Sequence, residues 1–194
     1  MSDYRRYYVK GGTYFFTLVS YSRKPILTLP KSRALLRDAI ASIRQRHPFD
    51  LVATVLLPDH WHMIMELPKD DSNFSTRIKL IKEAFSKLWR KNGFEEADVS
   101  EAQRHRGEAG IWQPRFWEHC VRDEKELESC VDYIHFNPVK HKLVKNVVNW
   151  EWSSFHRYLK AGHYEPGWGN TLPTTIADLP DDWGEPQSFG DQTD

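Results

Sequence analysis

The sequence predicts an α+β fold in which helices pack on a four-stranded antiparallel sheet. Three observations support this fold: short runs rich in aromatic and β-branched residues, longer stretches of helical periodicity between them, and turn residues at most boundaries. The expected order is β-α-β-β-α-β followed by a further helix, which is the split arrangement of ferredoxin-like domains. Because this arrangement hosts many unrelated activities, function has to be inferred from individual residues.

The first three strands and the first helix have clear signals. The apolar run Thr13–Tyr21 is rich in aromatic and β-branched residues and predicts the first strand. Apolar residues recur with helical spacing over Lys31–Arg46 and predict a helix. Two further strands, at 51–57 and 60–67, are separated by the turn-forming pair Pro58-Asp59, so we expect them to form a hairpin.

The second half of the chain predicts two long helices and one strand. The expected elements are a helix at 75–91, an exposed loop at 92–110, a strand at 111–119, a helix that Asp123 caps and that continues to about Phe136, and a short helix at 153–159. The helix after Asp123 should end at Asn137-Pro138, because a proline disfavours the helical conformation of the residue before it.

Charge divides the chain into a body and a tail. The 194 residues carry no net charge, but residues 1–159 hold 26 of the 27 basic residues and only 20 of the 27 acidic ones. We therefore expect one domain at 1–160 and an acidic C-terminal tail at 161–194 without a core of its own. A basic body favours a polyanionic partner, and an acidic tail could compete with that partner. The alternatives are a solvated extension, or a tail docked through Trp168 and Trp183.

The composition predicts a cytoplasmic protein without membrane segments. No apolar run approaches the roughly 20 residues of a membrane-spanning helix. The N-terminal residues lack the apolar core of a secretory signal. The two cysteines, Cys120 and Cys130, are not spaced as a redox pair, and we expect them to be reduced thiols.

Two histidines at the start of the third strand carry the strongest chemical signal. Residues i and i+2 of a strand point to the same face, so His60 and His62 present two imidazoles side by side while Trp61 faces the other way. Neutral imidazole is the commonest metal ligand, and two of them make a partial site that needs a third ligand from elsewhere. The spacing alone leaves open that they are two histidines on a polar sheet face.

A tyrosine and an asparagine form the second signal. Tyr133 and Asn137 are four residues apart at the end of a predicted helix, so both point the same way. An amide oxygen is an acceptable ligand for a hard divalent cation. A tyrosine beside a metal-bound phosphodiester could attack phosphorus, with the metal and a nearby base compensating for a phenol pKa near 10. The alternative is an ordinary helix residue with its hydroxyl at the surface.

Taken in order, the motifs resemble those of a known enzyme family. The resemblance covers about residues 4–160 and is carried, after the aromatic first strand, by the segments DHWHMI, WQPRFWEHCVRDE, YIHFNPVKHKLV and WEWSSFHRY. Together these segments resemble the REP-associated tyrosine transposases, bacterial relatives of the single-tyrosine HUH transposases. HUH denotes two histidines around a hydrophobic residue, here His60-Trp61-His62. The loop at 92–110 and the tail from 161 lie outside the resemblance.

The resemblance implies a metal-dependent enzyme that cuts and rejoins single-stranded DNA. Tyr133 would attack the scissile phosphate, giving a 5′-phosphotyrosine link and a free 3′-OH, and reversal by another 3′-OH would rejoin strands. His60, His62 and Asn137 would hold Mg²⁺ or Mn²⁺. The implied substrates are REP- or BIME-like hairpins with a short conserved tetranucleotide at the foot. The implied state is a monomer with its site in cis.

Other histidines compete for the metal. His119, at the end of the fourth predicted strand, is an alternative ligand or a proton acceptor. His135 is two residues from Tyr133 in a helix and therefore points about 160° away, which makes it a poor co-ligand. His141 follows Asn137 by four residues.

Basic and aromatic residues mark the expected DNA contacts. The helix at 75–91 carries six basic residues and one acid, so its polar face favours phosphate binding, although a solvated face would look alike. Near the N-terminus, guanidinium groups are mixed with aromatic rings that can stack on unpaired bases, and we expect Arg5 and Arg6 to read base edges. The candidate DNA-binding residues are Arg5, Arg6, Tyr7, Arg77, Lys79, Lys82, Lys87, Arg90 and Arg115.

Two other functions compete with strand transfer. One is a non-catalytic module that grips DNA hairpins, which the intact set His60, His62, Tyr133 and Asn137 disfavours. The other is a metal-dependent phosphodiesterase in which water attacks and Tyr133 is structural. A covalent protein–DNA adduct distinguishes strand transfer from both.

Overall fold

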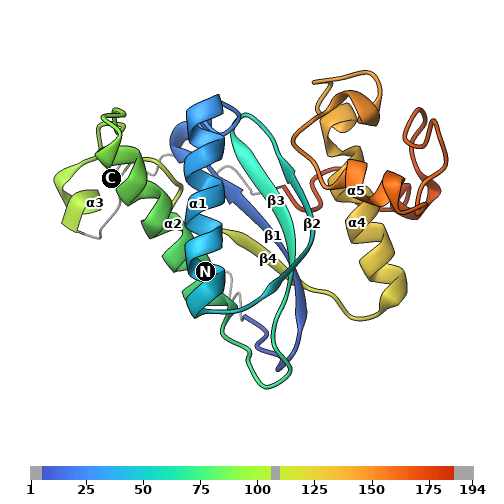
Figure 1. The fold of residues 1–194 in the computed structure, drawn as a ribbon, viewed down its shortest axis with the longest axis horizontal. Coiled ribbons are helices and arrows are strands. Elements are labelled where there is room, and N and C mark those ends of the chain that lie inside the picture. Colours follow the sequence, from blue (N-terminus) through green and yellow to red (C-terminus); the bar gives the residue numbers. More distant parts are fainter. Residues whose placement is uncertain (1–5, 106–109, 186–194) are drawn as a thin grey trace.

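The structure is a computed structural model that describes residues 6–105 and 110–185. It contains the expected four-stranded antiparallel sheet, in the order β2-β3-β1-β4. The strands are β1 (Thr13–Val19), β2 (Asp50–Leu56), β3 (His60–Glu66) and β4 (Trp117–Cys120). Figure 1 shows helices on both faces of this sheet, which confirms the predicted α+β fold. None of the helices in the described ranges is long and apolar enough to cross a membrane.

The helices form two outer layers. Helices α1 (Pro30–Arg46) and α2 (Phe74–Lys91) pack together on one face of the sheet, and α4 (Glu124–Lys140) covers the other face (Figure 1). Strand β1 lies between two apolar clusters. Tyr14 and Phe16 belong to the cluster under α1 and α2, and Phe15 belongs to the cluster under α4.

The alternation of β3 decides which of its side chains face α4. Trp61 and Met63 belong to the cluster under α1 and α2, whereas Ile64 belongs to the cluster under α4. His60 and His62 share the face of Ile64, as the strand period predicted. Pairing with β1 sets His62 opposite Thr17. Both imidazoles are therefore directed into the layer between the sheet and α4.

The fourth strand is shorter than the sequence predicted, and this part of the prediction was wrong. β4 covers Trp117–Cys120 rather than 111–119, because Pro114 has no amide hydrogen for the ladder. Ile111 and Trp112 are instead buried in the cluster under α1 and α2. The region expected as a loop at 92–110 also contains a short helix, α3 (Glu101–His105).

Helix α4 continues past its predicted end near Phe136. It runs to Lys140, with Pro138 inside its last turn. A proline this close to a helix end removes one hydrogen bond, while the carbonyl of Asn137 still accepts from the amide of His141 at 2.9 Å. The extension matters because it adds one more turn to the helix face that meets β3.

The chain around and beyond α5 (Phe155–Lys160) packs on the α4 side of the sheet. Before α5, the amide of Leu56 in β2 donates to the carbonyl of Trp152 at 2.8 Å, which covers an edge that could otherwise pair with another chain. After α5, Trp168 and Trp183 pack against the same apolar cluster as α4. The described part of the acidic tail is thus in contact with the body.

His135 ties α4 to its neighbours through a buried polar network. Its Nδ1 lies 2.8 Å from Tyr164 Oη, and its Nε2 lies 2.7 Å from Ser154 Oγ. Tyr164 donates its hydroxyl hydrogen to Asp132 at 2.7 Å, so it accepts from His135 Nδ1, and His135 Nε2 accepts from Ser154. A neutral imidazole fills both roles, and burial lowers the pKa of His135 to about 3.

We expect acid to destabilise the protein through His135. Its folded-state pKa of about 3 lies below the ordinary value of 6.5, so on acidification the unfolded chain takes up the proton first. The stabilisation is complete above pH 6.5 and is lost as the pH falls toward 3, at up to about 1.4 kcal/mol per pH unit. Thermal unfolding measured across this pH range should show that His135→Gln loses less stability on acidification than wild type does. The control variant His163→Gln, at an exposed position, should have the wild-type slope of stability against pH. If both variants have the same slope, His135 is not the source of the acid sensitivity.

Candidate active site

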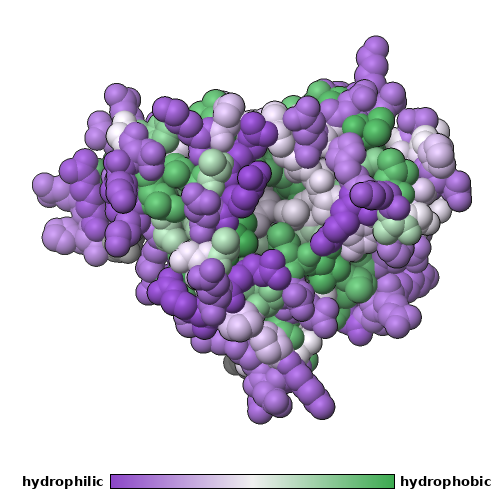
Figure 2. All heavy atoms as spheres, in the orientation of Figure 1, coloured by the Kyte–Doolittle hydropathy of each residue, from purple (hydrophilic) through white to green (hydrophobic). Residues whose placement is uncertain are grey.

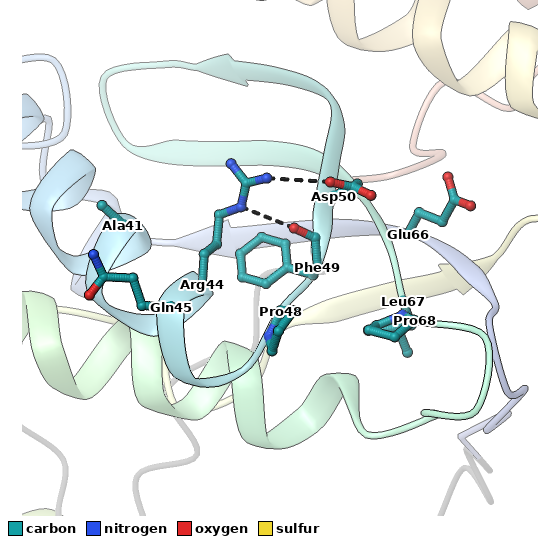
Figure 3. A pocket seen from close by; sticks show the side chains of 9 residues that line it. All are labelled: Ala41, Arg44, Gln45, Pro48, Phe49, Asp50, Glu66, Leu67 and Pro68. Carbon is teal, nitrogen blue, oxygen red and sulfur yellow. Dashed lines mark hydrogen bonds and ion pairs between the residues drawn. The ribbon is translucent and has the colours of Figure 1, made fainter.

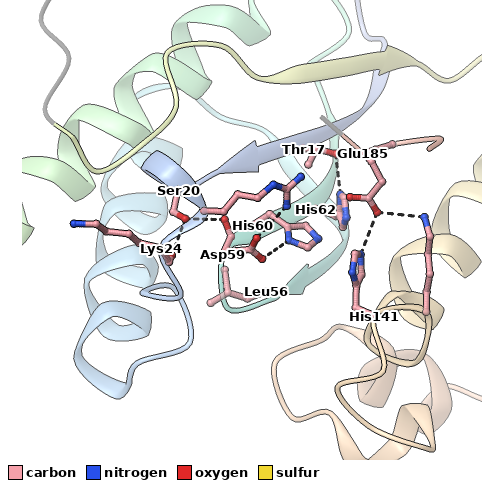
Figure 4. A network of polar contacts seen from close by, with 12 residues as sticks. Thr17, Ser20, Lys24, Leu56, Asp59, His60, His62, His141 and Glu185 are labelled. Carbon is pink, nitrogen blue, oxygen red and sulfur yellow. Dashed lines mark hydrogen bonds and ion pairs between the residues drawn. The ribbon is translucent and has the colours of Figure 1, made fainter. Parts of the chain in front are cut away.

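Two buried histidines of β3 form the centre of the candidate site. His60 and His62 are 2% and 0% exposed, and their ring centroids lie 4.8 Å apart. Figure 4 shows both imidazoles on the side of the sheet from which His141 and Glu185 approach. The strand thus delivers two potential metal ligands to one point under α4.

A carboxylate sets the tautomer of the first histidine. His60 Nδ1 lies 2.7 Å from Asp59 Oδ1. Although burial raises the pKa of Asp59, contacts with His60 and Arg23 lower it to about 2, so this carboxyl is ionised. Because a carboxylate only accepts hydrogen bonds, His60 Nδ1 carries a hydrogen, and in the neutral imidazole Nε2 then carries the lone pair.

A hydroxyl sets the tautomer of the second histidine. Thr17 Oγ1 donates to the carbonyl of Gly184 at 2.5 Å and lies 2.8 Å from His62 Nδ1. Since the single hydroxyl hydrogen is used, His62 Nδ1 donates to Thr17 and leaves its Nε2 with a lone pair. Burial, followed by the electrostatic interaction with His60, holds the pKa of His62 well below its ordinary value, so this ring is neutral.

These tautomers leave three ligand groups turned inward. Nε2 of His60, Nε2 of His62 and the side-chain amide of Asn137 are buried and form no hydrogen bond of ordinary geometry within the described ranges. Unpaired buried polar groups each cost about 1–3 kcal/mol, which a divalent cation bound to all three would offset. Hydrogen bonds on the far nitrogen are also the usual support of metal-binding histidines. The donor set therefore fits a divalent metal.

Helix α4 presents a polar stripe to these histidines. Tyr133, Asn137 and Lys140 recur at i, i+4 and i+7, so they share one helix face. Tyr133 is only 3% exposed, and its ring centroid lies 5.6 Å from that of His62. Lys140 Nζ donates to Tyr133 Oη at 2.9 Å. The tyrosine is buried beside the histidine pair and is not the surface residue that the alternative interpretation required.

Residues 183–185 of the C-terminal tail lie against Tyr133 and Lys140, and we call this arrangement the seated tail. Glu185 Oε1 accepts hydrogen bonds from Tyr133 Oη at 2.9 Å and from Lys140 Nζ at 3.2 Å. The ring of Trp183 packs edge-on against Tyr133, with centroids 4.9 Å apart. Together with the Thr17–Gly184 hydrogen bond, these contacts fix residues 183–185 across the tyrosine.

The seated tail changes the acidity of the tyrosine. Burial raises the pKa of Tyr133, and the carboxylate of Glu185 raises it further. Burial opposes ionisation of Glu185 as well, but His141, His62 and Lys140 among its neighbours lower its pKa below the ordinary range. In this arrangement Glu185 is charged and Tyr133 is a neutral phenol, which is a poor nucleophile.

Gly184 permits the close approach of the tail. Its φ is +71°, and a Cβ at this position would lie 3.1 Å from the Tyr133 ring. A residue with a side chain would be strained by the left-handed backbone and crowded by the ring. The glycine in Trp183-Gly184-Glu185 thus allows the tail backbone to lie directly against the ring of Tyr133.

A cavity of about 540 Å³ lies elsewhere, at the C-terminal end of α1 (Figure 3). Its lining includes Arg44, which bonds to the carbonyl of Phe49 and pairs with Asp50. Asp50 begins β2 and pairs with Glu66 at the end of β3, whereas His60 begins β3. The cavity is therefore at the opposite end of the sheet and contributes nothing to the histidine pair.

Comparison with known proteins decides the family. Residues 8–137 match the family described as "Transposase IS200 like". The chain belongs to this family. A REP-associated tyrosine transposase of Escherichia coli K12 is 42% identical over 172 residues, which are 89% of this chain and 93% of that protein. A protein with the corresponding name from Haemophilus influenzae is 44% identical over 170 residues, 87% of this chain and 94% of that protein.

A solved structure has the same fold. The structure of a REP-associated tyrosine transposase bound to a REP hairpin matches with a TM-score of 0.71 and 40% sequence identity. The match covers 90% of this chain and 96% of that one. The resemblance found in the motifs is confirmed, and the protein is a tyrosine transposase, an enzyme that cuts and rejoins DNA.

Two other histidines of the transposase have partners away from the candidate metal ligands. His119 Nε2 lies 3.1 Å from Glu126 Oε1, and Glu126 also binds Arg122. His135 faces the opposite side of α4, as its offset from Tyr133 predicted. The ring centroid of His119 lies 6.0 Å from that of Trp183, so this histidine is at the border of the site.

One expected DNA contact of the transposase has to be reassigned. Arg77 is 2% exposed, and its guanidinium donates to Asp71 and to the carbonyls of Pro48 and Asn73. It anchors the start of α2 to the preceding loop, and its burial leaves almost no surface for contact with a phosphate. Arg77 therefore has a structural role and is not one of the proposed DNA contacts.

The other expected DNA contacts lie on the surface or outside the described residues. Arg5 falls outside them. Arg6 pairs with Glu118 at 3.1 Å and stacks on Phe116, while Tyr7 is 75% exposed. The remaining basic residues are Lys82, which donates to the carbonyls of Gln113 and Pro114, and the exposed side chains Lys79, Lys87, Arg90 and Arg115.

Several residues of the site were missed by sequence reasoning. Lys140 continues the stripe of α4 by one turn, but Pro138 predicted that the helix would already have ended. Thr17 and Glu185 have no periodic relation to either motif. They could be found only once β1 was paired with β3 and the tail was placed on α4.

We expect Thr17 to support metal binding through His62. Thr17→Val removes the acceptor of His62 Nδ1 while preserving volume, so Mn²⁺ affinity should fall by about 10- to 100-fold, the usual effect of losing such a support. Thr17→Ser keeps the hydroxyl and should bind Mn²⁺ nearly as well as wild type. Isothermal titration with Mn²⁺ in the absence of DNA provides the measurement. Equal affinities in both variants would refute the supporting role.

Proposed function

We propose that this transposase cleaves and rejoins single-stranded DNA hairpins of the REP type, with Tyr133 as nucleophile. The observation that carries the proposal is the burial of Tyr133 beside two histidines whose Nε2 atoms have no hydrogen-bond partner among the described residues. The names of the relatives support the substrate, since one solved relative is bound to a REP hairpin and two others are named after REP elements.

The metal ligands in this proposal are His60, His62 and Asn137. When bound, the ion, Mg²⁺ or Mn²⁺, would polarise the scissile phosphate and stabilise charge on its oxygens. Two imidazoles favour Mn²⁺ over Mg²⁺, which prefers oxygen ligands. The ligand set therefore supports Mn²⁺ as the more effective ion.

The chemical step forms one bond to phosphorus and breaks another. The oxygen of Tyr133 bonds to phosphorus, the bond from phosphorus to the 3′ oxygen breaks, and the 5′ end remains attached as a phosphotyrosine. The phenol loses one proton and the 3′ oxygen gains one. Lys140, whose ammonium donates to Tyr133 Oη at 2.9 Å, favours the ionised tyrosine during attack. Because bond energy is kept in the phosphotyrosine, a 3′-OH can reverse the reaction without ATP.

The DNA-binding surface in this proposal combines aromatic and basic side chains. Exposed Tyr7 offers a ring for an unpaired base, and Arg6 presents a guanidinium next to it. Basic side chains of α2 and Arg115 supply phosphate contacts. All ligands and the nucleophile come from one chain, which is consistent with a monomer working in cis.

A covalent adduct tests the proposal directly. Wild-type protein incubated with Mn²⁺ and a single-stranded REP-like hairpin should give a slow, protease-sensitive band on a denaturing gel. Tyr133→Phe should give neither adduct nor cleavage, because the attacking oxygen is gone. Cleavage by Tyr133→Phe would instead indicate a water-attack phosphodiesterase. Tight binding without products in wild type would indicate a hairpin-binding module.

We also propose that the seated tail restrains this activity. Glu185 occupies the donors Tyr133 and Lys140, which a scissile phosphate needs, and it raises the pKa of the nucleophile. Cleavage then requires that residues 183–185 leave. This restraint acts at the nucleophile itself rather than on the basic surface of α2.

Gly184→Ala should release the tail and speed cleavage. A left-handed backbone and the 3.1 Å contact with Tyr133 together disfavour alanine in the seated state by about 1–2 kcal/mol, enough for a roughly 5- to 30-fold faster initial rate. Gly162→Ala is the matched control, because Gly162 also has a positive φ but has no atom within 4 Å of an added Cβ. Initial rates of adduct formation give the measurement. A rate for Gly184→Ala no higher than that of the control would rule out restraint by this segment.

A further inference from the structure

Three potential metal ligands converge where the tail meets the catalytic face. His60 comes from β3, His141 follows the last turn of α4, and Glu185 comes from the tail (Figure 4). One ligand atom from each lies within 4.8 Å of the other two. Only His60 is shared with the proposed catalytic set, so this cluster is a different combination of ligands.

The chemistry of this cluster suits a transition metal. Two imidazoles and one carboxylate are a common ligand set of Zn²⁺, with ligand atoms about 2.0–2.2 Å from the ion and therefore about 3.3 Å from one another. His141 Nε2 donates to Glu185 Oε1 at 3.1 Å, and Zn²⁺ would take the place of this hydrogen with release of one proton. The ring centroids of His60 and His141 lie 5.0 Å apart. Small side-chain rotations would bring the third atom into range.

His60 gives an independent sign of a ligand. It is 2% exposed, and its Nε2 is buried with no hydrogen-bond partner among the described residues. Asp59 holds the hydrogen on Nδ1, so the lone pair of Nε2 points inward. A carboxylate behind a histidine is the usual support of a zinc ligand.

We propose that the seated tail completes a Zn²⁺ site made of His60, His141 and Glu185, and that bound Zn²⁺ holds the tail in place. All three contacts of Glu185 are made by Oε1, so a rotation of the carboxylate would turn Oε2 toward Tyr133 and Lys140 while Oε1 ligates beside His141. Because both sets need His60, the tail-dependent site and the catalytic site cannot be filled together. This inference goes beyond the proposed function, since Zn²⁺ binding requires no DNA cleavage.

Zinc titration of four full-length proteins tests the site. Isothermal titration of the metal-free protein should give one Zn²⁺ per chain. Affinity should fall at least about tenfold in Glu185→Gln and in His141→Gln, because each removes one ligand. His62→Gln is the matched control, since it alters a neighbouring histidine that belongs only to the catalytic set. Circular dichroism verifies that each variant is folded.

A second measurement follows the tail. Hydrogen exchange of a peptide containing residues 183–185 should slow on addition of Zn²⁺ to wild type, and should not respond in Glu185→Gln. Gly184→Ala, which keeps every ligand but disfavours the seated tail, should also bind Zn²⁺ more weakly.

The outcomes separate this site from the catalytic one. Zn²⁺ affinity that falls in His62→Gln but not in Glu185→Gln would mean that zinc occupies the catalytic pair, and the proposal would be wrong. Absence of Zn²⁺ binding in wild type would also overturn it. Tyr133→Phe keeps all three Zn²⁺ ligands and should still bind one Zn²⁺ per chain while forming no covalent adduct, so failure of the strand-transfer proposal would leave this result unchanged.

Discussion

The burial of a polar helix stripe against a polar strand face is the constraint on which the site depends. Tyr133 of α4 lies beside His62, and Asn137 is buried on the same helix face, in the layer between the sheet and α4. Their alignment needs α4 to have one rotation about its axis, because a shift of one residue would turn the stripe by about 100°. The His135 network on the other side of α4, bonded to Ser154 and Tyr164, fixes that rotation.

Local periodicity was sufficient to predict which side chains of β3 and of α4 share a face. The period of two in β3 assigned His60 and His62 to one face and Trp61 to the other, and the structure has this arrangement. The helical spacing of Tyr133 and Asn137 likewise predicted a common face. These relations involve neighbours within one element, so they do not depend on how the elements pack.

The errors arose where tertiary packing competes with local patterns. Arg77 was assigned to a phosphate-binding stripe from its charge, although it stands three residues after Phe74 and four before Ile81 on the apolar face of α2. Its backbone partners, the carbonyls of Pro48 and Asn73, lie in loops whose positions no periodicity encodes. Glu185 is 52 residues from Tyr133, and only the folded tail brings them together.

The contacts of the tail also show how its acidic residues interact with the basic body. Net charge suggested a diffuse attraction, but exposed charges more than about 8 Å apart are largely screened at physiological salt. The described contacts are instead local: one carboxylate accepts from Tyr133, the proposed nucleophile, and from Lys140, a donor that a phosphodiester oxygen could use. A tethered carboxylate has a high effective concentration and needs little intrinsic affinity to stay seated. DNA held by several phosphate and base contacts can still displace it, so restraint by a single side chain is compatible with turnover.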